Sequence, residues 1–159
     1  MRLDIPKALR RKLRRAVRRG GRNEVGGVLM AEQIKPGHFR LVEFTVDGQV
    51  GGAAHFVRSV DDHRAALEGF FSRTGANYGR FNYLGEWHSH PNHIPIPSLE
   101  DVRSMEGLVD GERDIPFAVL VVVRAKWYGL LMSATLFQRG RPPCRVEVGD
   151  VTSRGFESP

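Results

Sequence analysis

Several side chains able to bind a metal ion lie in one short segment, GEWHSHPNHIPIPSLED, residues 85–101. His88 and His90 are two residues apart in a stretch with strand character, so their side chains point to the same face. Two imidazoles at that spacing can bind one ion without distorting the backbone. His93 lies in the loop that follows, and we expect it to be solvated. An H-x-H pair alone also fits a polar surface or a polar core position.

The second half of the segment supplies a carboxylate. Ser98 and Asp101 are three residues apart at the start of a predicted helix, which places them on one face. Prolines stiffen the connection from His90 and can return the start of the helix toward the end of the strand. Two neutral imidazoles and one carboxylate form a typical catalytic zinc set, with the fourth position left for water. Ser98 and Asp101 also match a capping box, which requires no metal.

A hydrolytic zinc site needs a base that is not itself a ligand. Glu24, in the stretch NEVGG, is the best candidate because Gly26 and Gly27 would let backbones approach closely beside it. Spacing alone does not single it out, since the chain has other glutamates. Glu86 is interpreted as a structural residue.

The remaining histidines show no pattern that indicates chemistry. His63 falls on the charged face of a predicted helix and is expected to point to solvent. His38 and His55 have no partner at a recognisable spacing.

Hydrophobic periodicity predicts the elements that must position these residues. The expected order is α-β-β-α-β-α-β-β-β, in one α/β or α+β domain spanning residues 1–159. Helices are expected at about 6–20, at 59–74 with Ser59 as a candidate cap, and at 98–109. Strands are expected at 24–34, 38–48, 81–90, 116–125, 127–139 and 144–148.

Positive charge is concentrated in one segment. The chain of 159 residues carries 24 basic and 18 acidic side chains, a net charge of +6. Residues 7–22 hold nine of the basic residues and no acid, so the remainder has 15 basic against 18 acidic residues, a net of −3. This helix could bind phosphates or an acidic partner. The single cysteine, Cys144, is interpreted as a small buried filler, and its isolation fits a reducing cytoplasm. No apolar run is long enough to span a membrane.

The motifs together resemble a known family. HSHPNHIPIPSLED matches the JAMM motif, H-x-H, seven residues, then S-x-x-D, and EVGGVL matches the upstream glutamate segment of the same family. The chain resembles prokaryotic JAB/MPN-type metalloproteases from the first helix to about residue 138. The resemblance implies a cytidine-deaminase-like α/β/α sandwich with a mixed central sheet.

The same resemblance implies an activity and residue roles. The expected activity is zinc-dependent hydrolysis of the peptide or isopeptide bond after the C-terminus of a ubiquitin-like protein. One Zn²⁺ per chain would be held by His88, His90 and Asp101. Glu24 would be the general base, and Ser98 the donor to the tetrahedral oxyanion.

Two bacterial settings fit this activity. One is the processing of sulfur-carrier-type ubiquitin-like proteins, and the other is deconjugation beside E1- and E2-like enzymes, including in antiphage operons. The second is preferred because no carrier or cell-wall peptidase is fused to the domain. The alternative function is a nucleic-acid-associated, radC-like module that uses the basic helix.

Overall fold

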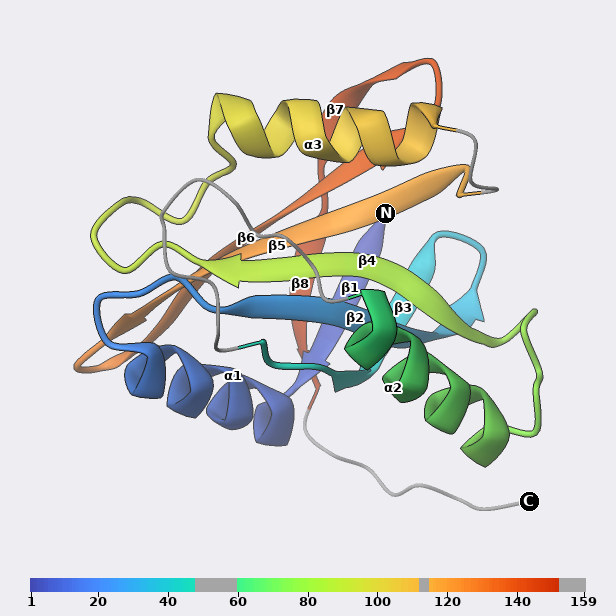
Figure 1. Cartoon of the computed structure of the whole chain (residues 1–159), viewed down its shortest axis with the longest axis horizontal. Coiled ribbons are helices and arrows are strands. Elements are labelled where there is room, and N and C mark those ends of the chain that lie inside the picture. The colour runs from blue at the N-terminus through green and yellow to red at the C-terminus, as the bar shows by residue number, and fades with distance from the viewer. Residues whose placement is uncertain (48–59, 112–114, 152–159) are drawn as a thin grey trace.

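The computed structural model describes residues 1–47, 60–111 and 115–151 (Figure 1). Its helices are α1 (Lys7–Gly20), α2 (Val60–Arg73) and α3 (Leu99–Asp110). Its strands are β1 (Arg2–Pro6), β2 (Gly26–Lys35), β3 (His38–Phe44), β4 (Phe81–Ser89), β5 (Phe117–Lys126), β6 (Gly129–Gln138), β7 (Arg141–Arg145) and β8 (Glu147–Val151).

The strands form one mixed sheet in the order β7-β6-β5-β4-β2-β3-β1-β8. The pairs β1–β3, β1–β8 and β4–β5 are parallel, and the other neighbours are antiparallel. The two edge strands, β7 and β8, are consecutive in the chain and only Val146 separates them. Since one residue spans only about 3.5 Å, the sheet must curl until its edges approach each other.

Helices cover both faces of this sheet (Figure 1). On one face, Leu13 and Val17 of α1 join a core that includes Trp87 of β4. On the other face, α2 packs Phe70 against β2, and α3 packs Met105 against β5. The arrangement confirms the α/β/α sandwich with a mixed central sheet.

The sequence explains why α1 lies on the sheet. Its apolar residues recur at spacings of three and four, which places Leu13 and Val17 on one buried stripe with Leu9 partly buried beside them. Gly21 ends the helix with a φ of 63°, a backbone conformation that favours glycine. The chain then turns through residues 22–25 into β2, and Glu24 lies in this turn.

The strand assignment from sequence was wrong at both termini. The first strand, β1, was not predicted, although Leu3 and Ile5 are fully buried in it. Its partners β3 and β8 are distant in sequence, so local periodicity does not reveal it. The predicted strand at 144–148 is instead split by Val146 between β7 and β8, because the chain crosses there from one sheet edge to the other. Ser59 and residue 48 lie outside the described residues.

Cys144 is exposed, contrary to the expectation of a buried filler. It lies on β7, an edge strand whose residues are all exposed. In the part of the chain that the structure describes, no helix is both long and apolar enough to cross a membrane.

Candidate metal centre

The end of β4 brings two imidazoles together. His88 and His90 are both buried, with 8% and 7% of their surfaces exposed. Their Nε2 atoms are 3.0 Å apart. Nδ1 of His90 lies 3.2 Å from the carbonyl oxygen of Ile94, so an Nδ1–H there donates to this oxygen and leaves the lone pair of neutral His90 on Nε2. The alternation predicted for H-x-H is therefore present.

Asp101 faces this pair from the first turn of α3. Its Oδ1 is 3.4 Å from Nε2 of His88, and its Oδ2 is 3.5 Å from Nε2 of His90. Burial alone would raise the pKa of Asp101, but the contact with His88 and the donors of Ser98 hold this pKa well below its usual range. The carboxylate is therefore ionised at neutral pH and available to a cation.

The spacing of these three donors fits a zinc ion. Candidate ligand atoms of His88, His90 and Asp101 all lie within 4.8 Å of one another. In a tetrahedral zinc site with bonds of about 2.0–2.1 Å, the ligand atoms are about 3.3 Å apart. The observed separations of 3.0, 3.4 and 3.5 Å are close to that value. Converging imidazole lone pairs and a carboxylate would repel one another unless a cation or a proton lay between them.

Glu24 stands beside this cluster, at the end of the turn that leads from α1 to β2. Gly26, two residues further on, pairs in register with His88. The Glu24 side chain is partly buried. Burial raises its pKa above the usual glutamate value, and the charges of His88 and His90 only partly offset this effect. Glu24 is therefore a stronger base than an exposed glutamate.

Ser98 caps α3 in the capping box that the sequence allowed. Its Oγ accepts a hydrogen bond from the backbone N–H of Asp101 at 3.1 Å. In return, the Ser98 backbone N–H and hydroxyl each donate to Oδ2 of Asp101 at 2.7 Å. Ser98 thus fixes the carboxylate that faces the histidines. Its side chain is exposed, so the hydroxyl can rotate toward a substrate.

Ser89 is a site residue that the sequence analysis missed. It lies between the two histidines and is fully buried. Its Oγ accepts a hydrogen bond from the backbone N–H of Val25 at 3.0 Å, and its own N–H donates to the Val25 carbonyl at 2.8 Å. These two bonds fasten the residue after Glu24 to the strand that carries the histidines. A small hydroxyl residue inside H-x-H was the only available signal.

The other histidines follow the predictions only in part. His93 is exposed in the loop, as expected. The prediction for His63 was wrong, because only 6% of its surface is exposed and its Nδ1 lies 3.2 Å from Oγ1 of Thr45. His38 has a partner after all, Asp4, at 2.7 Å. His55 lies outside the described residues.

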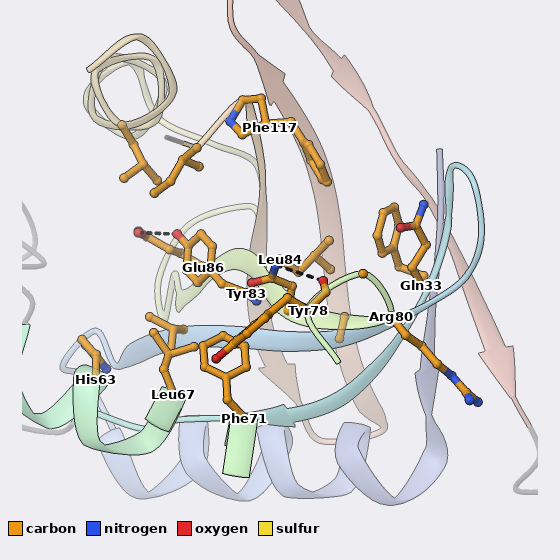
Figure 2. Close-up of a pocket in the computed structure, with 18 of the residues that line it drawn as sticks. Gln33, His63, Leu67, Phe71, Tyr78, Arg80, Tyr83, Leu84, Glu86 and Phe117 are labelled. Atoms are coloured by element: carbon orange, nitrogen blue, oxygen red, sulfur yellow. Dashed lines mark hydrogen bonds between the residues drawn. The ribbon is translucent and has the colours of Figure 1, made fainter. Parts of the chain in front are cut away.

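A cavity of about 780 Å³ lies on the face of the sheet that α2 and α3 cover (Figure 2). Leu67 and Phe71 of α2 line it, together with Tyr83 and Glu86 of β4. Glu86 is buried and accepts a hydrogen bond from the Tyr83 hydroxyl at 3.2 Å. This contact agrees with a structural role for Glu86.

The chain is similar in sequence to known proteins. Residues 6–136 match the family of prokaryotic homologs of the JAB domain. A protein of Escherichia coli named CD-NTase/cGAS isopeptidase is 32% identical over 110 residues, which cover 67% of this chain and 66% of that protein. A protein of the same name from Enterobacter hormaechei is 29% identical over 133 residues, covering 80% and 71% of the two chains.

Two solved structures share the fold. A protein of Desulfitobacterium hafniense has a TM-score of 0.70 and 19% identity, over 95% of this chain and 94% of that one. A protein of Salinibacter ruber has a TM-score of 0.57 and 19% identity, over 100% and 95% of the two chains. The family match covers most of the chain and includes all five motif positions, Glu24, His88, His90, Ser98 and Asp101. The chain therefore belongs to the family of prokaryotic JAB domain homologs.

Proposed function

We propose that this protein is a zinc-dependent isopeptidase that hydrolyses the peptide or isopeptide bond after the C-terminus of a ubiquitin-like protein. The observation that carries the proposal is the convergence of His88, His90 and Asp101 beside Glu24, in a chain that belongs to the JAB family. The relatives named isopeptidases support the reaction class. Residues 1–159 would act as one JAB/MPN domain, with α1 as an integral part.

Each site residue has a role that its surroundings support. His88, His90 and Asp101 would hold one Zn²⁺ ion, which when bound would polarise the scissile carbonyl group and acidify a water molecule. The raised pKa of Glu24 suits it to take a proton from that water onto a carboxylate oxygen. The same carboxyl group would then deliver the proton to the leaving nitrogen.

Ser98 would stabilise the negative charge that develops on the carbonyl oxygen. In this structure its hydroxyl donates to Asp101, so the hydroxyl must rotate to reach an oxyanion. Removing one such donor usually lowers the rate by a hundredfold or more. Asp101 would keep the backbone N–H of Ser98 as a donor during this rotation.

The names of the relatives also indicate a setting. We propose that the substrate of this chain is a conjugate that contains a CD-NTase-type protein. Such a conjugate would be formed in the cytoplasm by E1- and E2-like enzymes of an antiphage operon. The alternative, a nucleic-acid-associated radC-like module, would depend on the arginines of α1. The isopeptidase relatives favour the peptidase.

The test is cleavage of a ubiquitin-like protein that carries a short peptide after its C-terminal glycine. The zinc-loaded wild type should release the peptide, and Glu24→Gln should not. Glu86→Gln is a control, because Glu86 is a buried glutamate on the strand that carries His88 and would have no catalytic role. Equal loss of cleavage in both variants would contradict the role given to Glu24.

A further inference from the structure

The exposed face of α1 is a continuous basic surface, which we call the basic ridge. It consists of Lys7, Arg11, Lys12, Arg15, Arg18 and Arg19, all exposed. At 100° per residue these positions fall within an arc of about 140°, opposite the buried stripe. The helix has 14 residues, which gives the ridge a length of about 20 Å.

The ridge is not neutralised by the rest of the described protein. Within residues 1–47, 60–111 and 115–151, the one ion pair from α1 joins Arg10 to Asp150 at 2.8 Å, and Arg10 is not part of the ridge. Lys7, Arg11, Arg15 and Arg19 follow one another at intervals of four residues. Like charges at this interval destabilise a helix by a few tenths of a kcal/mol per pair. Charge repulsion within the ridge therefore opposes the stability of the helix.

An exposed aromatic pair lies against this helix. Trp127 and Tyr128 form the turn between β5 and β6, with 84% and 61% of their surfaces exposed. Nη2 of Arg14 donates to the carbonyl oxygens of Lys126 and Trp127, at 3.1 and 2.6 Å. These bonds hold the turn beside α1. Exposed tryptophan, tyrosine and arginine are the residues that most often dominate the binding energy of protein interfaces.

The Trp127–Tyr128 turn and the C-terminal end of the ridge lie at the end of the sheet that carries the candidate metal centre. Ser89 of β4 pairs in register with Val123 of the parallel strand β5, and β5 continues to Lys126. At about 3.3 Å per residue, the turn extends about 10 Å beyond the level of Ser89. The C-terminal end of α1 leads directly into the turn that carries Glu24 (Figure 1).

We propose that the basic ridge and the Trp127–Tyr128 turn together dock an acidic surface on the protein whose amine is the leaving group. This inference rests on the proposed function, in which Glu24 delivers a proton to the leaving nitrogen. Since α1 leads into the turn that carries Glu24, the C-terminal end of the ridge lies at the same end of the sheet as the residue that would donate this proton. Charge complementarity identifies the docked surface as acidic, and such charges accelerate encounter by tenfold or more.

The aromatic pair favours a protein over a nucleic acid as the occupant. Bases bind by stacking on open ring faces. The rings of Trp127 and Tyr128 pack edge to face, with an angle of 89° and centroids 5.3 Å apart, so one ring already covers a face of the other. The pair offers a compact apolar projection that fits a shallow pocket on a protein.

Binding and cleavage test this proposal separately. The binding probe is a ubiquitin-like protein fused at its C-terminal glycine to a green fluorescent protein with an acidic surface, compared with a fusion whose fluorescent protein has a neutral surface. The affinity of each fusion for Glu24→Gln protein is measured by calorimetry. We expect the acidic fusion to bind about tenfold more tightly at low salt, and the difference to disappear at about 0.5 M salt.

The ridge variant Arg11→Glu/Arg15→Glu/Arg18→Glu should lose this preference, and Trp127→Ala should weaken binding of the acidic fusion. The matched control is Lys35→Glu/Arg141→Glu/Arg145→Glu, which changes net charge equally at exposed positions elsewhere and should keep the preference. Should the glutamate variant fail to fold, the corresponding glutamine variant replaces it. Neither set should alter cleavage of the short-peptide fusion by protein with Glu24 intact.

Equal affinity for the two fusions, or equal effects of the ridge and control variants, would overturn the docking proposal. So would ridge-dependent binding of duplex DNA at about 0.15 M salt without any preference between the fusions. Failure of the wild type to cleave the short-peptide fusion would instead reject the proposed function. The two failures are therefore distinguishable.

Discussion

Gly27 of β2 is a position where a single added methyl group should damage both the fold and the site. A Cβ atom there would lie 2.1 Å from the backbone oxygen of Thr45 and 2.6 Å from its Oγ1. Both atoms already accept hydrogen bonds. Nε1 of Trp87 donates to the Thr45 backbone oxygen at 2.8 Å, and the backbone N–H of Val28 donates to Oγ1 at 2.9 Å. Gly27→Ala must therefore displace Thr45 and disturb both bonds.

The expected cost follows from these contacts. Overpacking a close-packed interior usually costs 1–3 kcal/mol. Each disturbed hydrogen bond adds about 1 kcal/mol. The lower conformational entropy of alanine in the unfolded chain offsets about 0.5–1 kcal/mol of this cost. We therefore expect Gly27→Ala to lower the free energy of unfolding by about 2–4 kcal/mol. With a urea dependence of about 2 kcal/mol per M, the midpoint should fall by about 1–2 M.

Urea unfolding followed by tryptophan fluorescence measures this shift. Gly107→Ala is the matched control, because Gly107 lies in α3 and a Cβ there meets nothing within 4 Å. Alanine at that helical position should leave the midpoint unchanged or raise it. Cleavage by Gly27→Ala should also fall, since Gly26 pairs with His88. A Gly27→Ala midpoint equal to that of the wild type would refute the reasoning from close backbone approach.

Three further predictions concern residues that hold the site or the sheet. Ser89→Ala leaves the buried Val25 N–H without its side-chain acceptor, so the free energy of unfolding should fall by about 1–3 kcal/mol. Steady-state kinetics should show that kcat falls more than KM rises, with the zinc content unchanged. Ser98→Ala and Ser98→Gly should both lose about a hundredfold in kcat, whereas only alanine should also cost about 1 kcal/mol in thermal unfolding, because glycine is tolerated as a cap. Burial tends to raise the pKa of Glu32, but hydrogen bonds from Arg80 and Arg40 lower it below 4.5 overall. The stabilisation from Glu32 is therefore present above pH 4.5 and lost as pH falls through the lowered pKa. The urea midpoints of wild type and Glu32→Gln should differ at neutral pH and converge as the pH falls through that lowered pKa.

Local spacing was sufficient to predict much of the candidate site. The alternation of a strand places His88 and His90 together, and the first turn of a helix places Ser98 beside Asp101. Those contacts form within segments of a few residues, so the sequence alone specifies them. The position of Glu24 depends on pairing between β2 and β4, which spacing does not reveal. The neighbouring glycines made Glu24 the best candidate among the glutamates, and the family resemblance supplied its role.

Long-range pairing explains what the sequence did not reveal. The strand β1 is recognisable only beside β3 and β8, where Asp4 is paired with His38. His63 is buried because α2 packs it toward Thr45, a residue far from it in sequence. Cys144 is exposed because β7 forms an edge of the sheet. In each case the burial or pairing of the residue depends on how distant segments pack together, which local sequence patterns do not predict.

Zinc content measured on three purified proteins tests the central claim most directly. Wild type and Glu24→Gln should each bind one zinc ion per chain after reconstitution and dialysis, and only the wild type should cleave the short-peptide fusion. His88→Ala should lose both zinc and cleavage, because it removes one of the three converging donors. Wild-type protein that cleaves without zinc, or His88→Ala that retains a full equivalent of zinc, would contradict the assignment of His88, His90 and Asp101 as the metal centre.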